Sequence, residues 1–478
     1  MFNVGNVAGG SIHDSAPAPG AVVSWHPSSA SLAKAQQAPI SAVPASNQQA
    51  AHLRSFRQHA ARDVEIPRRL LIPSWDIAGQ CDIQAMTYVL NSHLRRHDTY
   101  HSWFEFTDAD QIIRHTISEP TDIELVPTVY GEMTPDEWRS HILATPNPQQ
   151  WACFRFMIIQ RADHFTFCAC VDHLYADGMF FGVAFTEIHM MYAALMDGGG
   201  PIRLAAAGSY HDYCVRQRAY ISALTLESPE IRRWIEFAEN NGGTLPECPL
   251  PLGDKSPTPD LMSAQLLDEG QTAGFESACN AAGARFSGGV FACAALAQYE
   301  LTGADTYYGM TSVDTRRTPA DFMTTGFFGG NVPITIPITA SSFGDTVRAA
   351  QASFDSGKDL ADVPFGRVLA LAPWLRAPQR SVPVQFYFDV GCPPLSGLFS
   401  SQVDGLNVRI YRFSGFGNEL AIRVFRLEKE TQVIVQFPDN PVARDSVTRY
   451  ITALKSVYAR VADAHVALLA QGTGVVGW

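Results

Sequence analysis

The stretch Val171-Asp172-His173-Leu174-Tyr175-Ala176-Asp177-Gly178 decides how this 478-residue chain is interpreted. Residues 165–171 are aromatic, small or β-branched, which predicts a buried strand. Residues 179–196 are almost entirely apolar and long enough for a buried helix. A histidine in a short turn between two rigid elements has few rotamers, so its ring nitrogen can be directed at a substrate oxygen. The alternative is a core histidine with both nitrogens bonded internally, which is the commoner role for an arbitrary histidine.

The composition is that of a folded protein with more than one core. Hydrophobic residues make up 46% of the chain and charged residues 17%, as in globular proteins. Lys and Arg number 35 against 47 Asp and Glu, which gives a net charge of -12. We therefore expect no nucleic-acid partner, because phosphate binding depends on clustered positive charge. The arginine pairs at 68–69, 95–96 and 316–317 are too short for such a surface, although each could meet a substrate phosphate.

The cysteines and the apolar segments place the protein in a cell compartment. The nine cysteines are scattered, with no Cys-x-x-Cys pair and no histidines at zinc-finger distances. This pattern predicts a reducing compartment and no metal site, with Cys168 and Cys170 as small buried residues on one face of a strand. The first residues lack a secretory signal, and no run of about 18 uncharged apolar residues predicts a membrane-spanning helix. We expect a soluble, cytoplasmic protein.

Strands and helices alternate along the chain, which predicts an α/β fold with two sheet-and-helix lobes. Residues 1–50 are rich in Ala, Ser, Pro and Gly and predict a loosely structured lead-in. Residues 51–220 form the expected N-terminal lobe, residues 221–260 an inter-lobe crossover rich in Pro and Gly, and residues 261–478 the C-terminal lobe. Helices are expected at 80–96, 135–143, 179–196, 269–282, 288–301 and the C-terminal stripe 447–461, and strands at 100–106, 154–159, 261–267, 307–312, 332–338 and 382–388.

Several common catalytic signatures are missing from the sequence. There is no Gly-x-Ser-x-Gly elbow, no Gly-x-Gly-x-x-Gly after a strand, and no phosphate loop ending in Gly-Lys-Ser/Thr. What remains is a histidine base without an obvious protein nucleophile. That combination suits a reaction in which two bound substrates meet and the histidine removes a proton from one of them.

The segment from Asp172 to Gly178 resembles the His-x-x-x-Asp-Gly signature of the condensation-domain and acyl-CoA-dependent acyltransferase superfamily. Residues 90–97, 283–303 and 326–333 resemble other parts of that superfamily in the same order, and residues 411–418 fall where relatives have a strand that braces the lobes. Within the superfamily, the chain is most similar to the polyketide-associated protein (Pap) acyltransferases of mycobacteria, in the branch that acylates trehalose. This similarity rests on three sequence segments, at residues 95–100, 314–319 and 437–441.

The resemblance implies two chloramphenicol-acetyltransferase-like lobes that form a V with a central tunnel and hold His173 near its middle. The expected reaction moves a long-chain acyl group from acyl-CoA, or from a polyketide-synthase-bound thioester, to a hydroxyl of trehalose or acyl-trehalose. His173 acts as the general base, no acyl-enzyme forms, and acyl-CoA is a donor substrate rather than a cofactor. A polyketide synthase and a membrane lipid transporter are the candidate protein partners of an enzyme expected to be monomeric, in the cytoplasm or at the inner face of the membrane.

Roles of the neighbouring residues follow from the same resemblance. Asp177 can cap the following helix, worth about 1 kcal/mol, or pair with an arginine that holds the turn. A direct acid-base role for Asp177 is the less favoured alternative. Arg316 is the preferred partner over Arg317. Gly178 is expected to permit a tight backbone, and its amide could stabilise an oxyanion.

Other sequence features leave alternatives open. Asp172 stands where many superfamily members have the first of two adjacent histidines, and we expect it to bond nearby backbone. Four other histidines are expected to pack in the core or lie at the surface rather than bind a ligand: His93, His97, His101 and His189. Ser446 superficially matches a carrier attachment site, but a cap on the final helix fits better. Substrate-binding residues are not assigned, and rival functions are transfer to another alcohol, such as a lipid diol or glycolipid, or a non-catalytic role docking a synthase or lipid exporter.

Overall fold

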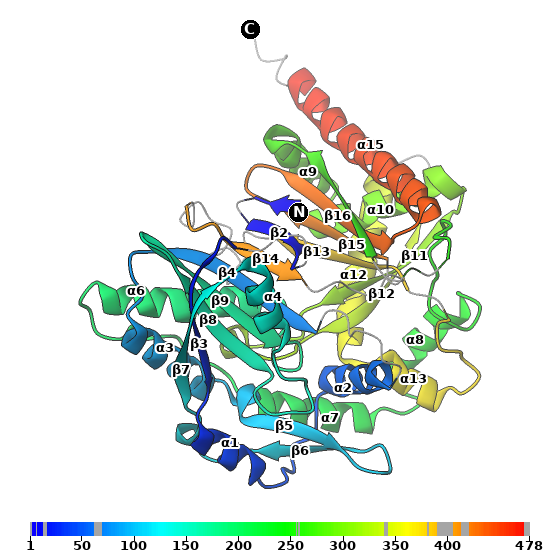
Figure 1. The fold of residues 1–478 in the computed structure, drawn as a ribbon. Coiled ribbons are helices and arrows are strands. Elements are labelled where there is room, and N and C mark those ends of the chain that lie inside the picture. The colour runs from blue at the N-terminus through cyan, green and yellow to red at the C-terminus, as the bar shows by residue number, and fades with distance from the viewer. Residues whose placement is uncertain are drawn as a thin grey trace. The chain divides into compact units, whose positions relative to one another are not determined.

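The computed structural model describes residues 2–5, 7–12, 17–61, 69–254, 256, 259–338, 343–379, 382–389, 405–412 and 420–472 (Figure 1). The chain divides into two compact units. The first unit holds the described residues up to Ser222 together with Arg316–Phe328 and residues 405–412. The second unit holds the remainder. The expected C-terminal lobe therefore lacks two segments, because residues 316–328 and 405–412 pack into the first unit.

The first unit is built around an eight-stranded sheet. Its spatial order is β1 (Phe2–Val4), β2 (Val7–Ser11), β14 (Arg409–Arg412), β4 (Leu70–Ala78), β9 (His164–Asp172), β8 (Phe154–Gln160), β3 (Gly20–Pro27) and β7 (Leu125–Met133). All neighbours are antiparallel except β14 and β2. A separate hairpin joins β5 (Ser102–Phe106) and β6 (Ile112–Thr116). The helices and helical turns of this unit are α1 (Ser29–Gln36), α2 (Asn47–Ala60), α3 (Ile83–Arg96), η1 (Asp98–His101), η2 (Pro120–Asp122), α4 (Pro135–Leu143), α5 (Phe180–Ala184), η3 (Phe185–His189), α6 (Met190–Met196), α7 (Tyr210–Ala223) and α11 (Pro319–Phe322).

The second unit carries a six-stranded sheet. Its order is β10 (Pro259–Leu267), β16 (Thr431–Pro438), β15 (Ala421–Arg426), β13 (Val384–Asp389), β11 (Thr306–Val313) and β12 (Gly330–Pro337). The β11–β13 and β13–β15 pairs are parallel, and the others are antiparallel. Its helices are α8 (Pro229–Glu239), α9 (Glu269–Ala281), α10 (Phe286–Thr302), α12 (Phe343–Gly357), η4 (Lys358–Asp362), α13 (Phe365–Leu371) and α15 (Pro441–Gly472). The buried stripe of α15, from Val447 to Val461, is confirmed.

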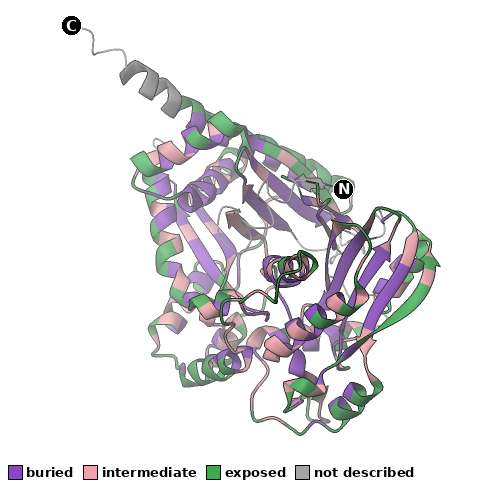
Figure 2. Cartoon of the chain, turned by 90° about the vertical axis from the view of Figure 1, so that its left-hand side faces the viewer, coloured by how far each residue is buried: buried purple, intermediate pink, exposed green. Residues whose placement is uncertain are grey.

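Strand β9 is buried on both faces, which explains why the sequence before the histidine is uniformly apolar. Cys168 and Cys170 face a small core with Ile72, as predicted for the two cysteines. Phe167 and Val171 face the main core of the first unit. Figure 2 shows that the strands of both sheets are largely buried. A central strand covered on both sides is a rigid platform for the turn that follows it.

The expectation of a loosely structured lead-in at residues 1–50 is wrong. Strand β3 lies inside the sheet, between β7 and β8. Trp25 is only 1% exposed, and its indole Nε1 donates to Thr87 Oγ1 at 2.7 Å. The Pro and Gly content suggested loose structure, but the short apolar segment 20–27 acquires its strand conformation from the distant strands β7 and β8.

Three further expectations differ from the structure. Residues 179–196 do not form one helix, because the π-helix η3 interrupts α5 and α6. Ser446 lies inside α15, and the helix is instead capped by Asn440, whose Oδ1 accepts from the Ala443 amide at 2.9 Å. Residues 234–239, whose pattern predicts a helix inside the crossover, belong to α8, which begins earlier, at Pro229, and buries Trp234 in a core of the second unit. Arg68 and residues 413–418 lie outside the described residues.

Among the described residues, none of the helices combines the length and the apolar character that a bilayer span requires.

Trp25→Ala is predicted to lower the free energy of unfolding by about 3–5 kcal/mol, because it leaves a cavity in the sheet core. Val129→Ala on the neighbouring strand β7 is the matched control, since Val129 is 76% exposed, and should change it by less than about 0.5 kcal/mol. Urea unfolding of both variants measures the difference. Equal small losses would mean that β3 does not belong to the core.

His141 on α4 makes the stability of the first unit depend on pH. Burial, then the Arg155 guanidinium and His26, lower the pKa of His141 to about 4. Arg155 donates to His141 Nε2 at 2.7 Å, which requires a neutral ring. An unfolded histidine takes up its proton near pH 6.5, so between about pH 6.5 and 4 the unfolded state binds more protons and stability falls as the pH falls. His141→Gln should flatten the fall in the thermal midpoint over that window, and His59→Gln on α2 should leave it unchanged. A slope unaltered in His141→Gln would contradict this assignment.

Candidate functional site

His173 begins the turn directly after β9 and is half-buried. Its backbone amide donates to the Arg69 carbonyl at 2.8 Å, which ties the turn to the residue before β4. Its ring Nδ1 lies 3.0 Å from the Ala176 carbonyl oxygen. A carbonyl oxygen only accepts, so Nδ1 carries the hydrogen and donates it. In the neutral ring, Nε2 is therefore the lone-pair nitrogen, which is the form a general base needs.

Asp177 and Arg316 form a buried ion pair at the far end of the same turn. Arg316 donates from Nη1 to Asp177 Oδ2 at 2.8 Å and from Nη2 to Oδ1 at 3.2 Å. The Asp177 carboxylate also accepts from the amides of Met179 and Phe328, both at 2.9 Å. Asp177 thus receives an arginine, as expected, but it does not cap the helix: the N-cap of α5 is Met179, and the Asp177 side chain bonds the amide of that residue. With four donors on its oxygens, it is a positioning group rather than a proton carrier.

Arg316 also holds the chain segment from which it comes. Its remaining donors reach the carbonyl oxygens of Asp321 and Thr324, both at 3.0 Å, and its guanidinium lies 4.0 Å from the Phe328 ring centre. The residues 316–328 are therefore fixed beside the His173 turn, and Phe327 packs on the histidine with the ring centres 4.9 Å apart. Arg317, the second choice as partner, has an exposed side chain, and its amide donates to Asp321 Oδ2 at 3.1 Å.

Gly178 differs from the expectation of a tight backbone. A Cβ placed on this residue would meet none of the described atoms within 4 Å, and its φ lies outside the left-handed region. Gly178 is exposed. The described residues therefore leave room for a side chain at this position.

Asp172 is completely buried and is bonded to side chains as well as to the backbone amide that was expected. Its Oδ1 accepts from His52 Nε2 at 2.7 Å and from the Leu174 amide at 2.9 Å, while Oδ2 accepts from Arg69 Nη1 at 3.0 Å. Burial raises the pKa of Asp172, but His52 and Arg69 outweigh it and hold the pKa below the ordinary value. No sequence pattern pointed to His52, because no spacing relates α2 to a motif 120 positions later.

A second buried carboxylate, Glu187 on the π-helix η3, gathers two of the histidines that were expected to pack. His93 Nδ1 and His97 Nε2 each lie 2.8 Å from Glu187 Oε2, and Arg96 Nε donates to Oε1 at 2.8 Å. Burial raises the pKa of Glu187, but His97 and His93 outweigh it and leave the pKa well below the ordinary value.

His93, His97 and Glu187 lie close enough together to hold a single metal ion. The tautomers of the two histidines, however, fit a hydrogen-bonded network. The Thr325 amide donates to His97 Nδ1 at 3.3 Å, so His97 Nε2 carries the hydrogen that it gives to Glu187. His93 donates from Nδ1, while its Nε2 lies 3.3 Å from the Tyr100 hydroxyl. Each polar group therefore has a partner without an ion, and the network connects the π-helix to Thr325, two residues before Phe327.

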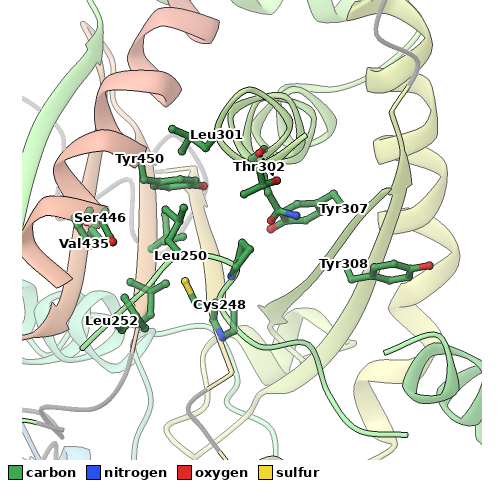
Figure 3. A pocket seen from close by; sticks show the side chains of 16 residues that line it. Cys248, Leu250, Leu252, Leu301, Thr302, Tyr307, Tyr308, Val435, Ser446 and Tyr450 are labelled. Carbon is green, nitrogen blue, oxygen red and sulfur yellow. Dashed lines mark hydrogen bonds between the residues drawn. The ribbon is translucent and has the colours of Figure 1, made fainter. Parts of the chain in front are cut away.

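The second unit has a separate apolar pocket (Figure 3). Its lining comes from the segment Cys248–Leu252, the end of α10, strands β11, β15 and β16, and α15. Burial raises the pKa of Tyr307 at its wall above the ordinary value. The pocket contains none of the predicted catalytic residues, although Ser446 borders it. Its lining is mostly apolar and suits an apolar group.

A model of the condensation-domain family matches residues 74–431. The solved structure of a PapA2 acyl transferase, at 53% sequence identity, superposes with a TM-score of 0.91 and covers 95% of this chain and 100% of that one. The first condensation domain of the calcium-dependent antibiotic synthetase, at 17% identity, has a TM-score of 0.63 over 87% of this chain and 97% of its own, and shows the same fold. The expected fold class, an α/β structure with two sheet-based lobes, is confirmed; the V and its tunnel stay predictions.

Curated proteins refine the family. Acyltransferase PapA3 of Mycobacterium tuberculosis is 51% identical over 465 residues, which are 97% of this chain and 98% of that protein. PapA1 of the same species, a 2'-acyl-2-O-sulfo-trehalose (hydroxy)phthioceranyltransferase, is 54% identical over 464 residues, 97% of this chain and 90% of its own. The trehalose-2-sulfate acyltransferase PapA2 of Mycobacterium bovis is 53% identical over 467 residues, 97% of this chain and 99% of its own. This chain belongs to the Pap acyltransferases of the condensation-domain family, as the motif resemblance predicted.

Asp177→Asn is predicted to destabilise the protein by about 3–5 kcal/mol, because it leaves the buried Arg316 guanidinium without its counter-charge. Arg317→Met is the matched control at the neighbouring, exposed arginine and should cost less than about 1 kcal/mol. Chemical unfolding of the two variants compares them. Similar losses for both would show that the ion pair does not hold the segment 316–328 in place.

Proposed function

We propose that this protein is an O-acyltransferase that moves a long-chain acyl group from coenzyme A, or from a synthase-bound thioester, to a hydroxyl of trehalose or an acylated trehalose. Two sets of observations support the proposal. Two relatives at more than half identity over nearly the whole chain bear names that describe acyl transfer to trehalose derivatives. The observation that carries the chemistry is the bond from His173 Nδ1 to the Ala176 carbonyl, because it leaves Nε2 as the acceptor in the neutral ring.

The reaction proceeds by direct attack. His173 Nε2 takes the proton of the acceptor hydroxyl as its oxygen bonds to the thioester carbonyl carbon. The tetrahedral intermediate then breaks its carbon–sulfur bond, and the leaving thiolate receives the proton from the His173 imidazolium. The products are an ester and a free thiol, and the base is regenerated. The Ala176 carbonyl helps to hold the imidazolium because it faces the Nδ1 hydrogen in both states.

An acyl-enzyme is not needed in this scheme, and the described cysteines do not favour one. The Cys153 carbonyl accepts from the Asp172 amide at 2.9 Å, and burial raises the pKa of the Cys153 thiol well above the ordinary value. Burial also raises the pKa values of Cys168 and Cys170. Thiols rather than thiolates are present at neutral pH, and the thiol is a poor nucleophile.

The remaining parts of the site have supporting roles in the proposal. Asp177 and Arg316 hold the turn that positions His173, and the exposed Gly178 leaves room for the reacting groups. The Gly178 amide as an oxyanion donor stays a prediction, as do a cytoplasmic location and a synthase or a lipid transporter as partner.

His173→Ala should reduce the release of free thiol from palmitoyl-CoA in the presence of trehalose by about a hundred- to ten-thousand-fold, the usual contribution of a positioned base. A thiol-reactive dye measures the rate, and mass spectrometry identifies the acylated sugar. His59→Ala, a histidine on α2 whose Nδ1 bonds the Ser55 carbonyl of its own helix, serves as the control. Undiminished turnover in His173→Ala would remove this residue from the mechanism. Failure of the unaltered protein with every thioester would favour a docking role instead.

A further inference from the structure

Helix α2 is bonded directly to the turn that carries His173. Its first turn has a capping box between Ser46 and Gln49. The Gln49 side chain donates from Nε2 to the Leu174 carbonyl at 2.9 Å, and its Oε1 accepts from Arg114 at 3.0 Å. Leu53 is fully buried. The residue three positions after Gln49 on this helix, His52, is therefore held at a fixed place beside the catalytic turn.

The His52 ring is oriented by Asp172 in the way that a carboxylate orients a catalytic histidine. Asp172 is a buried carboxylate whose pKa is held low, so it accepts the hydrogen of His52 Nε2 across 2.7 Å. In the neutral ring, His52 Nδ1 then carries the lone pair. Among the described residues, none forms a hydrogen bond with this nitrogen, and 14% of the side chain is exposed. Part of the His52 side chain is therefore open to solvent.

The two imidazoles are close neighbours. The ring centres of His52 and His173 are 6.4 Å apart. Both rings contact Phe327, whose ring centre is 6.3 Å from that of His52 and 4.9 Å from that of His173. Two imidazoles whose ring centres lie this close can each bind one of two neighbouring hydroxyls, because a hydrogen bond spans about 3 Å between heavy atoms.

We propose that His52 Nδ1 accepts a hydrogen bond from an acceptor hydroxyl next to the one that His173 deprotonates, so that the two imidazoles recognise a pair of neighbouring hydroxyls on a sugar. This inference rests on the proposed function, since it names the acceptor side of the same site. It makes Asp172 a positioning residue that acts through His52. A second imidazole thus reaches the site from α2, in a chain that has Asp172 where many superfamily members have a histidine.

The charge around His52 favours a hydroxyl over an anionic group as its ligand. The Asp172 carboxylate lies 2.7 Å from the ring and is held ionised by Arg69 as well. An anion on the opposite nitrogen would require His52 to be protonated and would face that carboxylate across the ring. A neutral hydroxyl needs only the lone pair.

The experiment combines variants with altered acceptors. His52→Phe removes the acceptor nitrogen and keeps a ring, and His52→Gln retains an amide donor for Asp172. His59→Phe, on the same helix, is the matched control. Isothermal calorimetry measures binding of trehalose and of trehalose analogues that lack one hydroxyl each, and steady-state kinetics measure KM for trehalose and for palmitoyl-CoA.

His52→Phe should weaken trehalose binding and raise its KM by about 3- to 10-fold, the range of one neutral hydrogen bond, without changing KM for palmitoyl-CoA. One deoxy analogue should bind the unaltered protein more weakly than trehalose does, by the same factor. Its affinity should not fall further in His52→Phe, because the missing hydroxyl and the substitution remove the same hydrogen bond. His52→Gln should show the same pattern with a thermal midpoint nearer to that of the unaltered protein.

The inference would be overturned if, for every analogue, the binding free energy lost by His52→Phe added to that lost by removing the hydroxyl. His52 would then act only through the fold. Undetectable binding of trehalose to the unaltered protein would overturn it as well. The proposed function fails separately: if the binding pattern above appears but no thioester is turned over, His52 still binds the sugar, and the transferase assignment is the part that is wrong.

Discussion

The buried ion pair between Asp177 and Arg316 is the constraint on which the rest of the first unit's site depends. It joins two points 139 positions apart, and both partners are almost completely inaccessible to water. A buried charge without its partner is expensive, so the pair forces residues 316–328 to remain with the motif turn. That segment supplies Phe327 to the rings of His173 and His52, and its Thr325 amide to His97. The segment accordingly belongs to the first unit, although the residues on both sides of it belong to the second.

The site is assembled from buried carboxylates that fix the tautomers of histidines. Asp172 accepts from His52, and Glu187 accepts from His93 and His97. A carboxylate that accepts from one ring nitrogen decides which nitrogen keeps a lone pair. The tautomer of His173 is set instead by the Ala176 backbone carbonyl, which carries no full charge. That difference matters for catalysis, because a carbonyl holds the ring without adding a negative charge next to the base.

Local sequence predicted much of the fold and part of the site. The strand before His173, the helix after Pro135 and the stripe of α15 each have a periodicity or a cap within a few residues, and all three appear in the structure. The His-x-x-x-Asp-Gly motif identified the histidine and the carboxylate, and the resemblance to the superfamily selected Arg316 as the partner that the structure shows. These features depend on neighbours in the chain or on a pattern shared by a whole family.

The features that sequence did not predict depend on distant partners. Strand β3 is held by β7 and β8, and β14 by β2 and β4, and no local pattern reports such pairings. His52 is functional in this account only because α2 is bonded to Leu174, which no spacing reveals. The π-helix η3 inserts within a uniformly apolar run, where Glu187 is the residue that departs from the pattern. The acidic residue Glu187 in this apolar run could have indicated a buried polar network, because a buried carboxylate needs partners.

The orientation of the His173 ring is the central claim, and nitrogen-15 NMR of histidine-labelled protein tests it most directly. The signals of His173 are assigned by their loss in a His173→Gln variant, and the spectrum is recorded near pH 7.5, where an ordinary imidazole is neutral. We expect the His173 ring to carry its hydrogen on Nδ1 and to leave Nε2 unprotonated. A hydrogen on Nε2, or on both nitrogens, would contradict the claim that this nitrogen stands ready to accept the acceptor's proton.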